Sequence, residues 1–214
     1  MNDPLRLEQV GIALPTRALI PALDITVAPG ECVTLMGPSG CVKSALLAFI
    51  SGALDAAFVA SGRVRIGEDD ITRLAPERRR VGILFQDDLL FPHLSVAGNL
   101  GFALAAHVRD RDERRAHIER ALAEADLSGF ADRDPATLSG GQRARVALMR
   151  TLLSGPRVLL LDEPFGRLDA QLRNDFRRFV FEHAAERGLP VLLVTHDEAD
   201  APAGGRVIRL ADFR

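Results

Sequence analysis

The chain has 214 residues, a formal net charge of −2 and a pI of about 6.2. Hydrophobic residues make up 47% of it and charged residues 26%, which excludes disorder as the main state and predicts one domain, or a core with one insert. The nearly balanced charge predicts no basic surface, so no nucleic acid is expected as a partner. Cys32 and Cys41 provide no disulfide framework, and the first residues lack a secretory signal, so we expect a reducing cytosol.

Short apolar, β-branched runs predict strands, and charged stretches with apolar residues at helical spacing predict helices. The expected strands are 5–10, 23–27, 32–36, 64–66, 81–85, 158–161, 191–195 and 207–210, and the expected helices are 44–50, 111–126, 142–153 and 170–187. Three of the strands are apolar throughout, which is typical of a parallel sheet buried on both faces. The uncharged stretch 89–108 contains proline, glycine and histidine, so we interpret it as a buried loop and helix and not as a membrane span.

The order of these elements predicts the fold class. Short antiparallel-looking strands come first and a βα alternation follows, which indicates an α/β core with an N-terminal antiparallel β subdomain. The segment 87–134 looks helical and lies between two strands, so it is expected to be an insert. We therefore predict a core formed by 1–86 and 135–214, and a helical subdomain formed by 87–134.

A glycine-rich loop joins the strand 32–36 to the helix that follows. It nearly matches the phosphate-binding pattern of Gly, four residues, Gly, Lys and Ser or Thr. Such a loop turns backbone N–H groups inward, and the helix N-terminus adds partial positive charge. Lys43, the single lysine of the chain, would bridge the β- and γ-phosphates of a nucleotide, and Ser44 would ligate Mg²⁺. The alternative is a glycine-rich strand–turn–helix corner without a ligand. The loop consists of Gly37, Pro38, Ser39, Gly40, Cys41, Val42, Lys43 and Ser44.

Further polar residues follow other predicted strands. Asp162 and Glu163 end the apolar run 158–161, Gln86 follows 81–85, and His196 follows 191–195. Ligands of open α/β sheets bind beyond the carboxyl ends of the strands, so Asp162 is placed to hold Mg²⁺ and Glu163 to polarise an attacking water. Each of these residues alone is more often structural. Together with the glycine-rich loop after 32–36, they place polar groups at four strand ends, which is a stronger pattern.

A second potential anion site opens the predicted helix 142–153. Its sequence is Leu138-Ser139-Gly140-Gly141-Gln142, and the alternative is a simple helix cap with flexible glycines. Two anion-binding helix ends about a hundred residues apart suggest two halves of one site. The halves could meet within one chain or across a symmetric dimer.

Together these residues resemble the ATP-binding subunits of bacterial ABC transporters, because the LSGGQ pentapeptide at 138–142 accompanies a P-loop. The segment 86–96 is similar to importer subunits of the thiamine and iron kind, and 134–169 is similar to YnjD-like subunits. The resemblance implies a P-loop (RecA-like) core, with ATP and Mg²⁺ as cofactors. It also implies a homodimer that closes on ATP, integral-membrane permease subunits as partners, and a substrate-binding protein as an indirect partner. The location would be peripheral, on the cytoplasmic face of the inner membrane. Because the chain ends soon after His196, we expect no C-terminal regulatory domain.

The resemblance also implies roles for individual residues. Glu163 would be the catalytic base, and His196 and Gln86 would be further catalytic residues. The metal would be bound by Ser44, Gln86 and Asp162. Residues 37–44 and Ala45 would hold the nucleotide. The γ-phosphate of the nucleotide bound to the other subunit would be contacted by Ser139, Gly140, Gly141 and Gln142.

Three departures from the family pattern concern the nucleotide. Val42 stands where the pattern has glycine, and would cost about 1–2 kcal/mol if that position required a positive φ. Ala45 lacks the hydroxyl that family members direct at the α-phosphate, and no aromatic residue precedes Phe49 to stack on adenine near Leu14. The main hypothesis is an ATPase that powers import. The alternative is a P-loop subunit that these substitutions impair in nucleotide binding and that acts mainly as an assembly partner.

Overall fold

The computed structural model describes residues 3–37, 41–104 and 108–210, with the side chains of residues 41 and 42 left out. The chain forms two compact units. The first consists of Met1–Ile83, Arg157–Glu163 and Phe181–Arg214, and the second of Leu84–Pro156 and Pro164–Val180.

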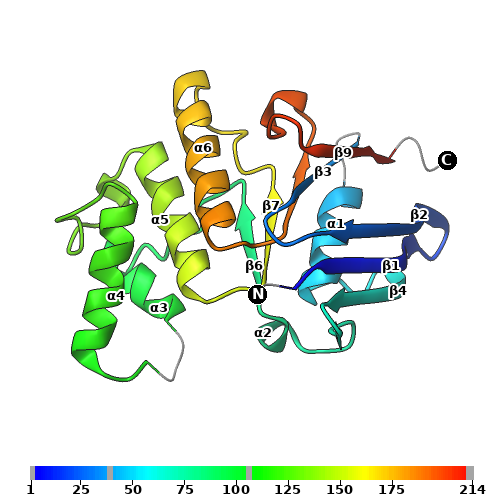
Figure 1. The fold of residues 1–214 in the computed structure, drawn as a ribbon, viewed down its shortest axis with the longest axis horizontal. Coiled ribbons are helices and arrows are strands. Elements are labelled where there is room, and N and C mark those ends of the chain that lie inside the picture. The colour runs from blue at the N-terminus through cyan, green and yellow to red at the C-terminus, as the bar shows by residue number, and fades with distance from the viewer. Residues whose placement is uncertain (1–2, 38–40, 105–107, 211–214) are drawn as a thin grey trace. The chain divides into compact units, whose positions relative to one another are not determined.

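The first unit contains an antiparallel sheet with strand order β2-β1-β4-β5 (Figure 1). Its strands are β1 (Leu5–Leu14), β2 (Arg17–Val27), β4 (Val59–Ile66) and the short β5 (Asp69–Asp70). The first three are longer than the apolar runs that predict them, because polar residues alternate with buried ones on the exposed face.

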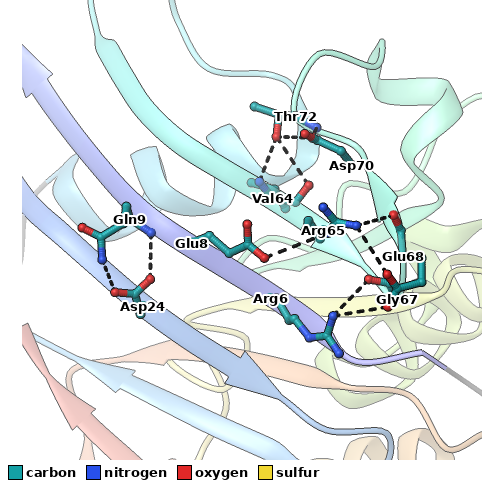
Figure 2. A network of polar contacts seen from close by, with 10 residues as sticks. All are labelled: Arg6, Glu8, Gln9, Asp24, Val64, Arg65, Gly67, Glu68, Asp70 and Thr72. Carbon is teal, nitrogen blue, oxygen red and sulfur yellow. Dashed lines mark hydrogen bonds and ion pairs between the residues drawn. The ribbon is translucent and has the colours of Figure 1, made fainter.

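A bulge at Gln9 bends β1, and Figure 2 shows the polar contacts around it. Gln9 has a φ of 51°, and its N–H donates to Asp24 Oδ1 of β2 at 2.8 Å. Across the bulge, Gly62 has a φ of +85°, and a Cβ at this position would lie 2.3 Å from the Gln9 carbonyl oxygen. Only glycine therefore fits at position 62.

The second sheet is parallel, with strand order β6-β7-β8-β3-β9. Its strands are β3 (Cys32–Met36), β6 (Val81–Phe85), β7 (Val158–Asp162), β8 (Val191–Thr195) and β9 (Arg206–Arg209). Helix α1 (Cys41–Ser51) shares one hydrophobic core with residues of both sheets, which places its N-terminus beyond the end of β3.

One buried cation holds the C-terminal end of α1. Arg79, the last residue of α2 (Pro76–Arg79), is 5% exposed. Its guanidinium donates to the carbonyl oxygens of Phe49 and Ile50 at 2.8 and 3.0 Å, and to those of Thr72 and Leu74 at 2.6 and 2.7 Å. A positive charge at this end of a helix is favourable, because the last carbonyls of the helix carry partial negative charge.

The described elements of the second unit are helical. They are α3 (Val96–Ala103), α4 (Arg111–Glu124), the 3-10 turn η1 (Pro135–Thr137), α5 (Gly140–Leu153) and the first part of α6 (Ala170–Glu186). Side chains cap the starts of α3, α4 and α5: Ser95 accepts from Gly98 N, Asp110 from Glu113 N, and Ser139 from Gln142 N.

The predicted elements are present, and the helical segment 87–134 falls within the second unit, where α5 and part of α6 join it. The predicted domain boundaries themselves stay a prediction. One interpretation needs correction: the stretch 89–108 is not buried throughout, because Leu89 is 55% and Phe102 69% exposed. Within the described ranges, no helix has the length and apolar character needed to cross a bilayer.

Candidate functional site

Three strands of the first unit end at one edge of the parallel sheet. β7 pairs with β8 and β8 with β3, all in parallel, so their carboxyl ends lie together. Asp162 is the last residue of β7, Glu163 follows it, and His196 follows β8. The P-loop begins after β3, but its residues 38–40 lie outside the described ranges. The arrangement agrees with the expectation that polar residues after these strands share an edge.

Lys43 lies in the first turn of α1, and its side chain is only 3% exposed. The ammonium donates to the Gly37 carbonyl oxygen at 2.8 Å, and Nζ lies 3.8 Å from Glu163 Oε1. The single lysine of the chain is therefore held between the start of the P-loop and the acid that follows β7. Burial of this kind strengthens the interaction of the ammonium with a nearby anion.

Glu163 has two charged or polar neighbours, one on each carboxylate oxygen. While Oε1 faces Lys43, Oε2 lies 3.1 Å from His196 Nδ1. Glu163 has a φ of 49°, a left-handed conformation that is uncommon for a non-glycine residue and clusters at functional sites. Its N–H donates to the Val194 carbonyl of β8 at 2.9 Å, which fixes the backbone in this conformation.

Ser44 and Asp162 form the second pair of the site. The exposed Ser44 hydroxyl lies 3.4 Å from Asp162 Oδ1. Burial raises the pKa of the Asp162 carboxyl above its usual range, and the Glu163 charge adds to this, while Ser44 and Lys43 act in the opposite direction. Hydroxyl and carboxylate oxygens are the ligands that Mg²⁺ prefers, and Mg²⁺ uses one or two protein ligands together with substrate phosphates. The donor set therefore fits this ion, although the described residues contain no cluster of three acidic, histidine or cysteine ligands.

The predicted second anion site lies at the start of α5, in the second unit. Ser139 and Gln142 form a reciprocal capping box: Gln142 N donates to Ser139 Oγ at 3.3 Å, and Ser139 N donates to Gln142 Oε1 at 2.9 Å. Gly141 is buried, and a Cβ there would lie 3.3 Å from Leu172 Cδ2. The pentapeptide thus starts a well-capped helix whose second glycine packs against α6.

Gln86, also in the second unit, is exposed and lines a pocket of about 120 Å³. The residues that follow it are held by arginines of α5. Asp88 Oδ2 accepts from Arg143 Nε at 2.9 Å, and Arg150 donates to the carbonyls of Asp88 and Leu89 at 3.0 and 2.8 Å. Sequence reasoning missed both arginines, because charged helix residues usually face solvent and the pattern does not show which ones turn inward.

The structure bears on the three departures to different degrees. Residue 42 is in the first turn of α1, and a helical backbone has a negative φ. The free-energy cost of a valine at positive φ therefore does not apply to Val42. Ala45 is 5% exposed and belongs to the hydrophobic core. Leu14, near which adenine was expected, ends β1. Its neighbour Ala13 lines an apolar hollow of about 200 Å³.

Comparison with known proteins decides the family. Residues 20–166 match the model of the ABC transporter family. The chain is 46% identical to the ABC transporter ATP-binding protein YnjD of Escherichia coli (strain K12), over 98% of this chain and 96% of that protein. The chain belongs to the ABC transporter ATP-binding family.

Other ABC relatives are named for import. The chain is 40% identical to the Fe(3+) ions import ATP-binding protein FbpC 1 of Haemophilus influenzae and 47% identical to the sulfate/thiosulfate import ATP-binding protein CysA of Xanthomonas campestris, over 94% and 83% of this chain. It spans only 60% and 53% of those two proteins.

A solved ABC structure also matches. It is CbiO1 of Clostridium perfringens, described as part of the CbiONQ complex, with a TM-score of 0.84 at 27% identity, covering 98% of this chain and 85% of that one. The predicted family and fold class are thereby confirmed: a P-loop core with an antiparallel β subdomain and a helical insert.

Proposed function

We propose that this chain binds and hydrolyses ATP to drive substrate import through the membrane subunits of an ABC transporter. The observation that carries the proposal is the contact of Glu163 with both Lys43 and His196, at 3.8 and 3.1 Å, beside the Ser44–Asp162 pair. The candidate phosphate-binding cation Lys43, the candidate metal ligands Ser44 and Asp162 and the candidate base Glu163 thus share one edge of the sheet. Family membership supports the same reading, because ATP hydrolysis is the activity of ABC transporter ATPases.

Each residue would have a distinct role. Lys43 would hold the β- and γ-phosphates together with the backbone of residues 37–42. Ser44 and Asp162 would hold Mg²⁺, which would neutralise phosphate charge when bound. Glu163 would accept a proton from the attacking water, and His196 would orient the Glu163 carboxylate through Oε2.

The remaining predicted site residues would act from the second unit. The start of α5, at Ser139, Gly140, Gly141 and Gln142, would receive the γ-phosphate held by another copy of the chain. Gln86 would contact the metal bound by its own chain. A homodimer that closes on ATP is the simplest arrangement with two equivalent sites, because symmetric pairing supplies each P-loop with one such helix end.

The proposed partners are integral-membrane permease subunits and, through them, a substrate-binding protein, and the chain would lie on the cytoplasmic face of the membrane. Support comes from relatives whose names describe import and from CbiO1, described as part of a transporter complex. An apolar cluster on the second unit offers a surface for a permease. Phe91 packs against Phe102 with ring centroids 4.7 Å apart, and Phe102 is 69% exposed.

The second candidate is a subunit impaired in nucleotide binding, and Ala45 is the observation that favours it. Its side chain belongs to the apolar core and has no hydroxyl for the α-phosphate. A lost hydrogen bond to a charged group is worth about 1.5–3 kcal/mol, or roughly 10- to 150-fold in affinity.

The test is ATP affinity and turnover of the purified chain, alone and with its permease, beside Val42→Gly and Ala45→Thr. Ala48→Thr, on the same helix, controls for the cost of threonine in α1. The main proposal expects magnesium-dependent turnover by the unmodified chain. Absence of turnover, with recovery in the Val42→Gly/Ala45→Thr double variant, would establish the impaired subunit. Absence of turnover in every variant would contradict ATP hydrolysis by this chain.

A further inference from the structure

Two buried polar residues flank the exposed His196. Thr195 is 1% exposed and Asp200 is 3% exposed, although neighbouring residues 196, 198 and 199 are exposed. The Thr195 hydroxyl donates to Asp200 Oδ2 at 2.7 Å and accepts from Asp197 N–H at 3.1 Å. Because one hydroxyl makes both contacts, it ties the last residue of β8 to the short turn η2 (Glu198–Asp200) and closes the loop that carries His196.

Packing does not hold the imidazole itself. The His196 side chain is 56% exposed, and its described contact is with Glu163 Oε2. Glu163, by contrast, is fixed by its backbone bond to Val194 of β8. The position of the imidazole relative to this carboxylate therefore depends on the backbone between residues 195 and 200. A surface ion pair joins Glu198 of this loop to Arg209 of β9, and exposed pairs contribute little to holding a structure.

We infer that Thr195 and Asp200 are positioning residues that hold His196 against Glu163. Both side chains are buried, so they act through the loop and not on the nucleotide. A hydroxyl that donates to a buried carboxylate makes a short, strong hydrogen bond, which suits a rigid support. The inference rests on the proposed function, since it concerns the residues proposed to activate water.

Thr195→Val tests the hydroxyl with little change in shape. Lys43 and Ser44 lie on α1 and keep their geometry, so the KM for ATP is expected to stay unchanged while kcat falls about 10- to 100-fold. Thr195→Ser keeps the hydroxyl and is expected to restore most of kcat. Thr34→Val is the matched control. Thr34 is fully buried on β3, where it pairs with Leu193 of β8, the strand that ends at Thr195.

A double-variant cycle separates positioning from a general loss of structure. If Thr195 acts through His196, then Thr195→Val in a His196→Ala background lowers kcat no further. An equal additional loss in that background, or an equal loss from Thr34→Val, would overturn the inference.

A spectroscopic readout does not depend on turnover. The ¹⁵N resonance of His196 Nδ1, assigned by its disappearance in His196→Ala, reports the contact with Glu163. Thr195→Val and Asp200→Ala should shift this resonance, and Thr195→Ser and Thr34→Val should leave it in place. An unchanged resonance in Thr195→Val would contradict the positioning role even if the chain hydrolyses ATP. A shift without any turnover in the unmodified chain would instead contradict the proposed function alone.

Discussion

The polar residues at the sheet edge of the first unit and those at the start of α5 in the second are satisfied in different ways. At the sheet edge, charged side chains contact one another: Glu163 meets both Lys43 and His196. At the start of α5, the capping box of Ser139 and Gln142 satisfies the helix end from within. Under the proposed function, the first region would have its charged side chains in contact before a ligand binds. The second would present the backbone dipoles of a capped helix end to a phosphate held by another copy of the chain.

Glu163→Gln tests the first side of this comparison and has the largest expected effect. An amide cannot accept the proton from water, so turnover should fall about 10²- to 10⁴-fold while ATP binding persists. The variant should also accumulate as an ATP-bound dimer, measured by light scattering with and without nucleotide. Undiminished turnover would remove Glu163 from the mechanism and leave its contacts with Lys43 and His196 as structural ones.

Arg79→Met asks how far the sheet-edge region depends on support from the far end of α1. The change leaves the carbonyls of Phe49, Ile50, Thr72 and Leu74 without their shared donor in a buried place. Unfolding free energy should fall by about 2–4 kcal/mol, measured by urea denaturation. Arg78→Met, at the adjacent exposed position, is the control and should change it by less than about 0.5 kcal/mol. Equal effects at both positions would contradict the role assigned to the buried guanidinium.

Phe91→Ala concerns the second unit, and it tests whether Phe91 belongs to a docking surface or to the core of that unit. Phe91 is half-buried beside the exposed Phe102, whereas Phe176, 2% exposed, is core. Phe176→Ala should cost about 3–5 kcal/mol and lower the melting temperature by roughly 10 °C. Phe91→Ala should lower it far less, yet abolish co-purification with the permease. A melting temperature as low as that of Phe176→Ala would show that Phe91 belongs to the core.

The smallest expected effect concerns Cys32, at the start of β3 and away from the ligand edge. Burial raises the pKa of its thiol to about 12, so the reactive thiolate is scarce at neutral pH. In a Cys41→Ser background, labelling by a thiol reagent should be slow at pH 7.5 and should rise about tenfold per pH unit up to pH 9.5. The rate is read by mass spectrometry, with Cys32→Ser as the blank. Fast labelling at pH 7.5 would mean that the first residues of β3 become exposed in solution.

Much of the fold could be predicted from local pattern. The largely apolar runs 32–36, 158–161 and 191–195 correspond closely to β3, β7 and β8, because strands buried on both faces leave a nearly continuous apolar sequence. The helix after the P-loop was expected at residue 44 but begins at Cys41. Pattern locates a helix more securely than its ends, which depend on hydrogen bonds that sequence does not show.

The sequence by itself determined which residues follow each buried strand, and parallel pairing then brought Asp162, Glu163 and His196 to one edge. Only the tertiary structure decided which of them touch. The left-handed backbone of Glu163, whose N–H donates to the Val194 carbonyl, depends on the register of β7 against β8. The four carbonyls around Arg79 come from segments up to 30 residues away in the sequence. Periodicity and turn chemistry are local properties, whereas such contacts arise from the packing of distant segments, and no short stretch of sequence encodes them.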